Sequence, residues 1–301
     1  MPGPTLIIHG GAGAREGSHA SFERYQQSLL SIREAAWEVL QTDGARASVL
    51  AAIRLLEDDP VFNAGLGSRL QRDGVARMSA AIMDGRSESF SGVINIEGVR
   101  HPIDIAAALS GARHTVIAGA HATAFARSLG VEDFNPVTEH RLQEHRDQLA
   151  GKTGTVGAIA LDVDGGLCVG TSTGGVGQEI PGRVSDSATA AGTYASRAAG
   201  VSCTGVGEHI VNHGAAVRIV TRVEDGAGLE RAVSMTIDEA DRRDLEYGLI
   251  ALDHSGRAIA ACTRGVVTLF ASRQSASGQS WSDQDFLGAP AAARDAGGNF
   301  T

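Results

Sequence analysis

The chain has 301 residues, of which 43% are hydrophobic and 20% charged, and its formal net charge is −9. These values are those of an ordinary globular protein that is long enough to bury a large core. Because no stretch is rich in lysine or arginine, the acidic balance argues against nucleic acid or an anionic membrane as a partner.

The N-terminal segment, the lengths of the apolar runs and the cysteines bear on where in the cell the protein is expected. The N-terminal MPGPTLIIHGG has no basic region, its apolar run is too short for a signal peptide, and no apolar segment approaches the ~18 residues of a membrane span. Cys168, Cys203 and Cys262 are odd in number and lie in apolar runs, which predicts buried thiols rather than a disulfide framework. We therefore expect a cytoplasmic protein.

The first half of the chain alternates short apolar runs with helical patterns. Residues 5–8 predict a buried strand that enters a glycine loop at 9–13. Apolar residues then recur at helical spacing on both sides of Asp43-Gly44, which ends the first of two helices. The elements expected next are strands at 76–85 and 91–99, a helix at 103–112, a strand at 114–119 and a helix at 120–130.

Residues 138–150 are polar throughout and predict an exposed helix or linker. The elements expected after them are strands at 156–163, 167–173, 192–196, 247–253 and 257–263, and helices at 207–223 and 229–243. Hairpins with Asp-Gly and Ser-Gly turns, and helices in separate layers, favour an α+β fold over a doubly wound sheet. The Ser/Gly/Ala-rich tail 273–301 is predicted to be poorly ordered.

Several common catalytic patterns fit this sequence badly. Gly170–Gly174 is a literal G-x-S-x-G, but the glycines and Pro181 that follow it exclude the helix that a nucleophile elbow requires. The glycine runs match neither G-x-G-x-x-G nor a Walker loop, and no histidine pair has H-E-x-x-H spacing. We therefore predict neither an esterase triad nor a nucleotide or metal site.

The junction of Gly154 and Thr155 allows a different chemistry. A threonine hydroxyl is a weak nucleophile that needs a base, and a free α-amine with a pKa of ~7.7–8.0 can act as one. That amine exists only if the peptide bond before Thr155 is cut, and a preceding glycine tolerates strained geometry. Thr155 also opens the apolar run 156–163, which would hold the new terminus on a rigid strand. The pattern alone fits an ordinary strand threonine equally well.

The surrounding motifs make the chain similar to the plant-type (type 2) asparaginases, or isoaspartyl peptidases, of the N-terminal-nucleophile (Ntn) hydrolase superfamily. The resemblance spans most of the sequence. It is carried by IIHGGAGA at 7–14, FNAGLGS at 62–68, AAIMDG at 80–85, KTGTVGAIALDVDG at 152–165, TSTGG at 171–175, PGRVSDS at 181–187, SCTGVGE at 202–208 and GLIALD at 248–253.

This resemblance implies one Ntn-hydrolase domain, a four-layer αββα sandwich, over residues 1–301. It also implies an inactive precursor that cuts itself by attack of the Thr155 hydroxyl on the carbonyl of Gly154. The α subunit would be 1–154, ending in a linker at 138–154, and the β subunit 155–301. Two αβ units would form a homodimer.

The resemblance also implies catalytic roles. Thr155 would be the nucleophile, and its freed amine the general base. Thr173 would orient the nucleophile, and Thr204 and Gly205 would supply the hydroxyl and N–H of the oxyanion hole, where each donor is typically worth about 3–4 kcal/mol.

Substrate binding is implied in the same way. Arg183 would hold the substrate's α-carboxylate, which suits a bidentate guanidinium, and Asp186 and the backbone of Gly207 would receive the α-ammonium. Asn63 would lie close to the nucleophile. The loop near Phe62 would wrap a structural sodium ion in backbone carbonyls, with no other cofactor.

The expected activity is hydrolysis of L-asparagine or of β-aspartyl (isoaspartyl) dipeptides. A glycosylasparaginase-like hydrolase and an uncleaved, ligand-binding relative remain alternatives. The chain departs from the family pattern at several positions, which put substrate preference in doubt and suggest that Tyr247 and Arg264 reshape the leaving-group side of the pocket. These positions are Ser79, Ser185, Tyr247, Cys262 and Arg264.

Overall fold

A computed structural model of the chain describes residues 3–13, 19–148, 154–274, 280–282 and 294–295. The described strands form two sheets. The first has the order β12-β11-β1-β5-β6-β2-β3-β4 and the second β13-β10-β9-β8-β7. Most neighbouring strands are antiparallel, and β3 and β4 are parallel.

The strands of the first sheet are β1 (Thr5–Gly13), β2 (Met78–Asp84), β3 (Ser89–Ile96), β4 (Val116–Ala118), β5 (Val156–Leu161), β6 (Leu167–Thr173), β11 (Val267–Gln274) and β12 (Ser280–Ser282). Those of the second sheet are β7 (Thr193–Ala195), β8 (Ala199–Gly205), β9 (Tyr247–Asp253), β10 (Ala258–Cys262) and β13 (Arg294–Asp295). The helices are α1 (His19–Asp58), α2 (Pro102–Ala108), α3 (Gly119–Ser128), α4 (Glu139–Arg146), α5 (Gly207–His213), α6 (Ala215–Glu224) and α7 (Leu229–Asp241).

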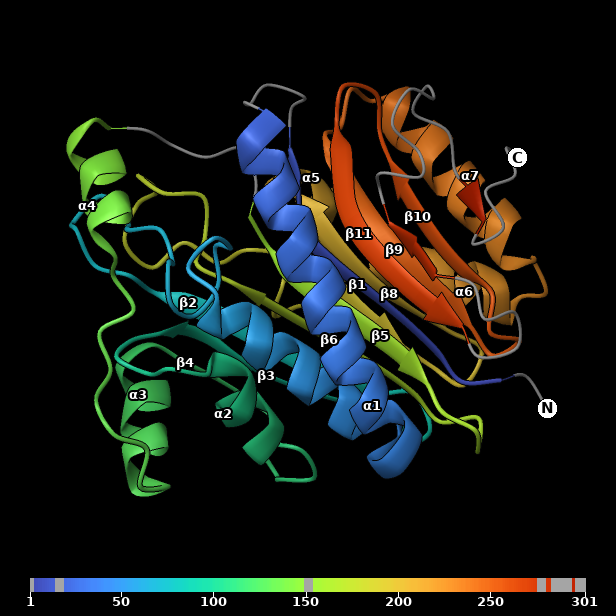
Figure 1. Cartoon of the computed structure of the whole chain (residues 1–301), viewed down its shortest axis with the longest axis horizontal. Helices are drawn as coiled ribbons and strands as arrows, with labels where there is room; N and C mark the ends of the chain where they lie inside the picture. Colours follow the sequence, from blue (N-terminus) through green and yellow to red (C-terminus); the bar gives the residue numbers. More distant parts are fainter. Residues whose placement is uncertain (1–2, 14–18, 149–153, 275–279, 283–293, 296–301) are drawn as a thin grey trace.

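The two sheets pack face to face between two helical layers (Figure 1). Helices α1, α2 and α3 cover the outer face of the first sheet, and α6 and α7 cover that of the second. This arrangement is the expected four-layer αββα sandwich, and it confirms the α+β class.

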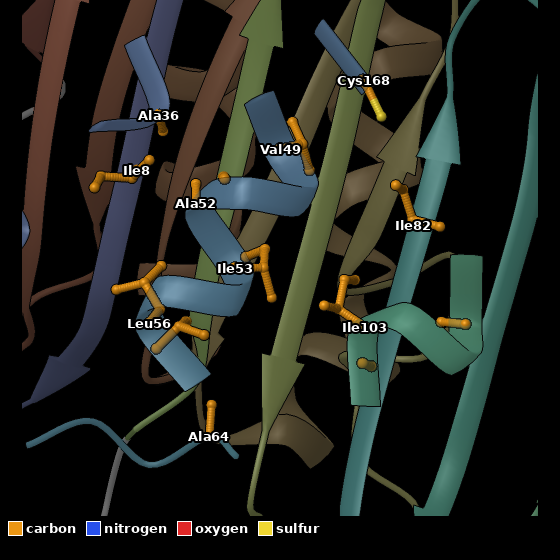
Figure 2. Packing of buried hydrophobic residues seen from close by; sticks show 14 of the residues in the cluster. Ile8, Ala36, Val49, Ala52, Ile53, Leu56, Ala64, Ile82, Ile103 and Cys168 are labelled. Carbon is orange, nitrogen blue, oxygen red and sulfur yellow. The ribbon is translucent and has the colours of Figure 1, made fainter. Parts of the chain in front are cut away.

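Within the described ranges, three apolar cores hold the layers together. The largest joins α1 and α2 to the first sheet, and Figure 2 shows Val49 and Ile53 of α1 facing Ile82 of β2. The second core fills the space between the second sheet and α6 and α7. The third, which includes Ile159 of β5 and Ile250 of β9, lies between the sheets. Strands β5 and β6 are both buried on both faces; β5 appears in the sequence as a continuous apolar run, whereas β6 ends in Thr171, Ser172 and Thr173.

Glycines change the course of the predicted helices at two positions. The helical patterns on either side of Gly44 form one kinked helix, α1, in which Gly44 has non-helical angles (φ 81°, ψ −177°). The single helix predicted at 207–223 is wrong, because left-handed Gly214 (φ 61°) ends α5 and separates it from α6.

Strand predictions failed in several places. The glycine loop expected at 9–13 is the second half of β1, which pairs with β11 across an irregularity between His9 and Gly11. The strands β8, β11, β12 and β13 were not predicted. Strand β8 is buried along nearly its whole length, so side-chain alternation along it gives little signal, and the short strands β12 and β13 lie in the tail that was predicted to be poorly ordered.

The linker at 138–154 and the tail at 273–301 stay predictions. Helix α4 occupies part of the proposed linker, and residues 149–153 lie outside the described residues, as does most of the tail. Among the described residues, no helix is long and apolar enough to cross a membrane.

Candidate active site

The proposed nucleophile lies where the two central strands of the first sheet meet. Thr155 immediately precedes β5, and the pairing of Val156 with Ser172 places it opposite Thr173, the last residue of β6. Thr155 is only 6% exposed, and its Oγ1 donates to Thr173 Oγ1 at 3.2 Å. The Thr173 hydroxyl also accepts from the backbone N–H of Gly175 at 3.2 Å, which fixes its position.

The second sheet brings Thr204 and Gly205 to this point. The Thr204 hydroxyl accepts from the N–H of Ala12 at 3.1 Å and donates to the carbonyl oxygen of Thr155 at 3.4 Å. Gly205 has φ 138°, and a Cβ there would lie 2.6 Å from the Cα of Tyr247. A side chain at position 205 would therefore displace β9, which explains the glycine next to Thr204.

Asn63 lies beside the proposed cleavage site. Its side-chain amide donates to the carbonyl of Gly175 at 2.5 Å and accepts from the N–H of Arg69 at 2.8 Å, and its own carbonyl accepts from Gly174 at 2.8 Å. A Cβ on Gly154 would lie 2.5 Å from the Cβ of Asn63. The loop after α1 and the end of β6 thus enclose Gly154 closely.

The proposed substrate-binding residues also converge. A Cβ on Gly207 would lie 2.8 Å from Arg183 Nη2, 3.0 Å from Asp186 Oδ1 and 3.1 Å from Ser185 Oγ. Arg183 makes a bidentate ion pair with Glu208, at 2.6 and 2.7 Å. This pair holds the guanidinium in place and lowers the pKa of Glu208 by hydrogen bonding.

The environment of Asp186 is suited to binding a cation. It is 1% exposed, and burial raises its pKa to about 7. Its Oδ1 accepts from Ser185 Oγ at 2.9 Å, whereas its Oδ2 is buried without a hydrogen-bond partner among the described residues. Such an acceptor suits an incoming ammonium group, which would also favour the ionised carboxylate.

Sequence reasoning missed three groups near the site, of which Glu57 and His9 are buried and Glu208 is exposed. Glu57 accepts from Ser172 Oγ at 2.6 Å and from the N–H of Ile103 at 3.2 Å, and burial raises its pKa to about 7. It therefore joins the end of α1 to β6 and to α2. The G-x-S-x-G serine is thus a fully buried strand residue, in agreement with the rejection of an esterase.

The second missed group is His9, which lies in the HGGAG motif. Burial lowers its pKa to about 3, so the ring is neutral, and its Nε2 lies 3.0 Å from Ser202 Oγ. The Ser202 hydroxyl also forms a hydrogen bond with the Thr171 hydroxyl, which in turn accepts one from Thr193. The third is Glu208, which ends the CTGVGE motif and was not recognised as the partner of Arg183.

The departures from the family pattern lie in different places. Ser79 is paired with Thr173 across β2 and β6, and Ser185 binds Asp186, so both adjoin the site. Cys262 ends β10. The expectation for Tyr247 was wrong: its fully buried side chain packs into the outer core and contacts His213. The side chain of Arg264 is 85% exposed and lies beside Asp241.

The described residues contain no group of three or more His, Cys, Asp or Glu side chains that could hold a metal ion. Backbone carbonyls near Phe62 are nevertheless brought together. A Cβ on Gly67 (φ 91°) would lie 2.6 Å from the carbonyl oxygen of Pro60 and 3.0 Å from that of Phe62. Such convergent carbonyl oxygens are suitable ligands for a hard cation.

Comparison with known proteins gives matches over most of the chain. A family profile described as Asparaginase matches residues 2–280. The chain is 42% identical over 273 residues to an isoaspartyl peptidase/L-asparaginase from Synechocystis sp., covering 84% of this chain and 83% of that protein. It is 37% identical over 287 residues to an isoaspartyl peptidase from Salmonella typhimurium, and 34% identical over 282 residues to a plant-type L-asparaginase from Pyrococcus horikoshii. Each of these two alignments covers 84% of this chain and 90% of the relative.

Proposed function

Because this chain belongs to the asparaginase family, we propose that it is an autoprocessing amidohydrolase acting through an acyl-enzyme on Thr155. Its substrates would be L-asparagine and β-aspartyl dipeptides. The observation that carries the proposal is the contact of Thr155 with Thr173 and Thr204, from two different sheets. A threonine that only stabilises a strand would not require hydroxyl groups from two sheets around it.

Activation is the first proposed reaction. The Thr155 hydroxyl adds to the carbonyl carbon of Gly154, the C–N bond breaks, and an ester links the two residues. Water then hydrolyses that ester. The products are a carboxylate on Gly154 and a free amine and hydroxyl on Thr155, which supply the base and the nucleophile together.

Catalysis repeats this chemistry on the substrate. Arg183 binds the α-carboxylate and Asp186 the α-ammonium, which places the side-chain amide at Thr155. The amine of Thr155 removes the hydroxyl proton as the oxygen attacks, and Thr204 and the N–H of Gly205 stabilise the oxyanion. The leaving ammonia or amino acid takes the proton from the amine, and water then releases aspartate by the same route.

The direct test uses purified protein and the Thr155→Ala variant. Intact-mass analysis of the wild type should show two chains separated at Gly154–Thr155, with release of ammonia from asparagine or of the free amino acid from a β-aspartyl dipeptide. Thr155→Ala should remain one chain without activity. A wild type that stays uncut and inactive after long incubation contradicts the proposal.

Two alternatives are decided by the same preparation. A glycosylasparaginase-like enzyme would hydrolyse a glycosylated asparagine faster than a β-aspartyl dipeptide. An uncleaved relative would bind an amino acid without turnover.

Further parts of the proposal rest on the family resemblance. We propose a homodimer of αβ units in the cytoplasm, and a structural sodium ion held by backbone carbonyls near Phe62. The carbonyls of Pro60 and Phe62 that converge on Gly67 support the ion. If sodium binds there, replacing NaCl by choline chloride at equal ionic strength should lower the melting temperature.

A further inference from the structure

A separate cavity lies in the outer helical layer that covers the second sheet, where α5, α6 and α7 are labelled in Figure 1. Its volume is about 270 Å³. This is several times the roughly 30 Å³ that a water molecule occupies in the liquid. Its lining residues come from the end of α5, from α6, and from the end of α7 and the turn that follows it: His213, Arg218, Glu239, Arg242 and Arg243.

The cavity carries an excess of positive charge. Glu239 already accepts from Arg222 at 2.6 Å and lies 3.5 Å from Arg218. Arg242 and Arg243 are exposed, and in the described part of the chain neither forms an ion pair. In a protein of net charge −9, unpaired guanidinium groups around one cavity indicate an anionic ligand.

The cavity also has a buried polar floor. His213 is 2% exposed, and its Nε2 lies 3.6 Å from Glu239 Oε2, an atom that is buried without a hydrogen-bond partner among the described residues. Burial lowers the pKa of His213, and the charges of Arg218 and Arg243 lower it further, so the ring is neutral. The positive charge of the cavity therefore comes from the arginines.

One contact leads from this floor to the active site. The Nδ1 of His213 lies 2.7 Å from the Tyr247 hydroxyl. Tyr247 pairs with Gly205 across β9 and β8, and its Cα would lie 2.6 Å from a Cβ at position 205. A movement of the Tyr247 ring would thus act on the strand that carries Thr204.

We propose that this cavity binds a small oxyanion with at least two negative charges, and that the bound anion acts on Thr204 and Gly205 through His213 and Tyr247. Arginine suits such a ligand because its planar fork binds carboxylate or phosphate oxygens in pairs. The ligand class is a phosphate ester or a di- or tricarboxylate. The site does not depend on the proposed reaction, and binding can be measured without turnover.

Binding is tested by calorimetric titration with inorganic phosphate and with citrate, at constant ionic strength. Arg242→Ala/Arg243→Ala should weaken binding of the preferred anion at least tenfold. Arg113→Ala, which removes another exposed arginine, should leave binding unchanged. Arg183→Gln should also leave it unchanged, since the anion is not in the active site. The tighter of the two anions distinguishes a phosphate from a polycarboxylate source.

Three results would overturn the site: no binding of either anion to the wild type, full binding to the double variant, or loss of binding in Arg183→Gln alone. The coupling has its own test. A saturating anion should change kcat in the wild type and not in Tyr247→Phe, which lacks the contact with His213. An unchanged wild-type kcat would show that the coupling is wrong.

Discussion

Replacing Gly154 by alanine should slow self-cleavage without harming the mature enzyme. Gly154 has φ 155°, and the added Cβ would lie 2.5 Å from Asn63 Cβ and 2.6 Å from its Nδ2. Asn63 has little freedom to turn away, because Gly175 and Arg69 bind both ends of its amide. The carbonyl of Gly154 must therefore move, or Asn63 must lose these hydrogen bonds.

The size of the effect follows from these two routes. Ordinary carbon contacts lie near 3.5–4.0 Å, so the overlap is about 1 Å, and a displacement of that size in a reacting group can cost about 100-fold in rate. Breaking the two hydrogen bonds instead costs about 1–3 kcal/mol, which is about 5- to 150-fold. Both routes predict cleavage slowed by about one to two orders of magnitude.

Cleavage is followed by intact mass at timed intervals after purification. Gly228→Ala is the matched control, because Gly228 has φ −63° and nothing lies within 4 Å of its added Cβ. After cleavage, Gly154 has no assigned role in turnover, so kcat per cleaved molecule should equal that of the wild type. Cleavage of Gly154→Ala within about threefold of the control rate would refute the reasoning.

Four further predictions concern the site. Thr173→Val keeps the side-chain shape and removes the hydroxyl that contacts Thr155, so we expect kcat to fall with little change in KM; a rise in KM alone would contradict an orienting role. Thr204→Val removes an oxyanion donor and should lower kcat about 10²–10³-fold, measured by ammonia release; a loss below about fivefold would exclude that role. Because burial raises the pKa of Asp186 to about 7, the affinity for aspartate, measured by calorimetry, should fall as the pH drops below 7, and Asp186→Asn should bind weakly at every pH. The raised pKa also means that Asp186 binds its proton more tightly in the folded protein than in the unfolded chain. The contribution of Asp186 to the free energy of unfolding should therefore decrease as the pH rises from about 4 to about 7. In urea denaturation measured over this pH range, the free energy of unfolding of Asp186→Asn should change less with pH than that of the wild type.

The sequence predicted the parts of this structure that depend on local patterns. The β5–β6 and β9–β10 hairpins follow from apolar runs joined by Asp-Gly and Ser-Gly turns. The motifs also indicated which residues would form the site. Gly214 shows the limit of local patterns, because the apolar period continues through it while the backbone turns left-handed.

Long-range contacts could not be predicted in this way. Glu57 lies 115 residues from Ser172 in the sequence, and only the packing of α1 on β6 brings them together. The same holds for the pairing of Arg183 with Glu208, which requires the loop after β6 to meet the start of α5. Tyr247 was predicted to face the pocket but packs in the core under α6 and α7, because a strand residue can point to either face of its sheet and the strand register determines which.

The strand order has a consequence for the protein after cleavage. In the first sheet, β1 from the segment before Thr155 lies between β11 and β5 from the segment after it, and β6 pairs with β2. A cut at Gly154–Thr155 would therefore leave two polypeptides whose strands are interleaved in one sheet. They could not dissociate without breaking the hydrogen bonds between these strands. Once unfolded, such a molecule has to refold as a bimolecular assembly, so its recovery should depend on protein concentration, whereas the uncut precursor folds as one chain. The cleaved enzyme would thus refold less readily than the precursor, and its lifetime would depend on how slowly it unfolds.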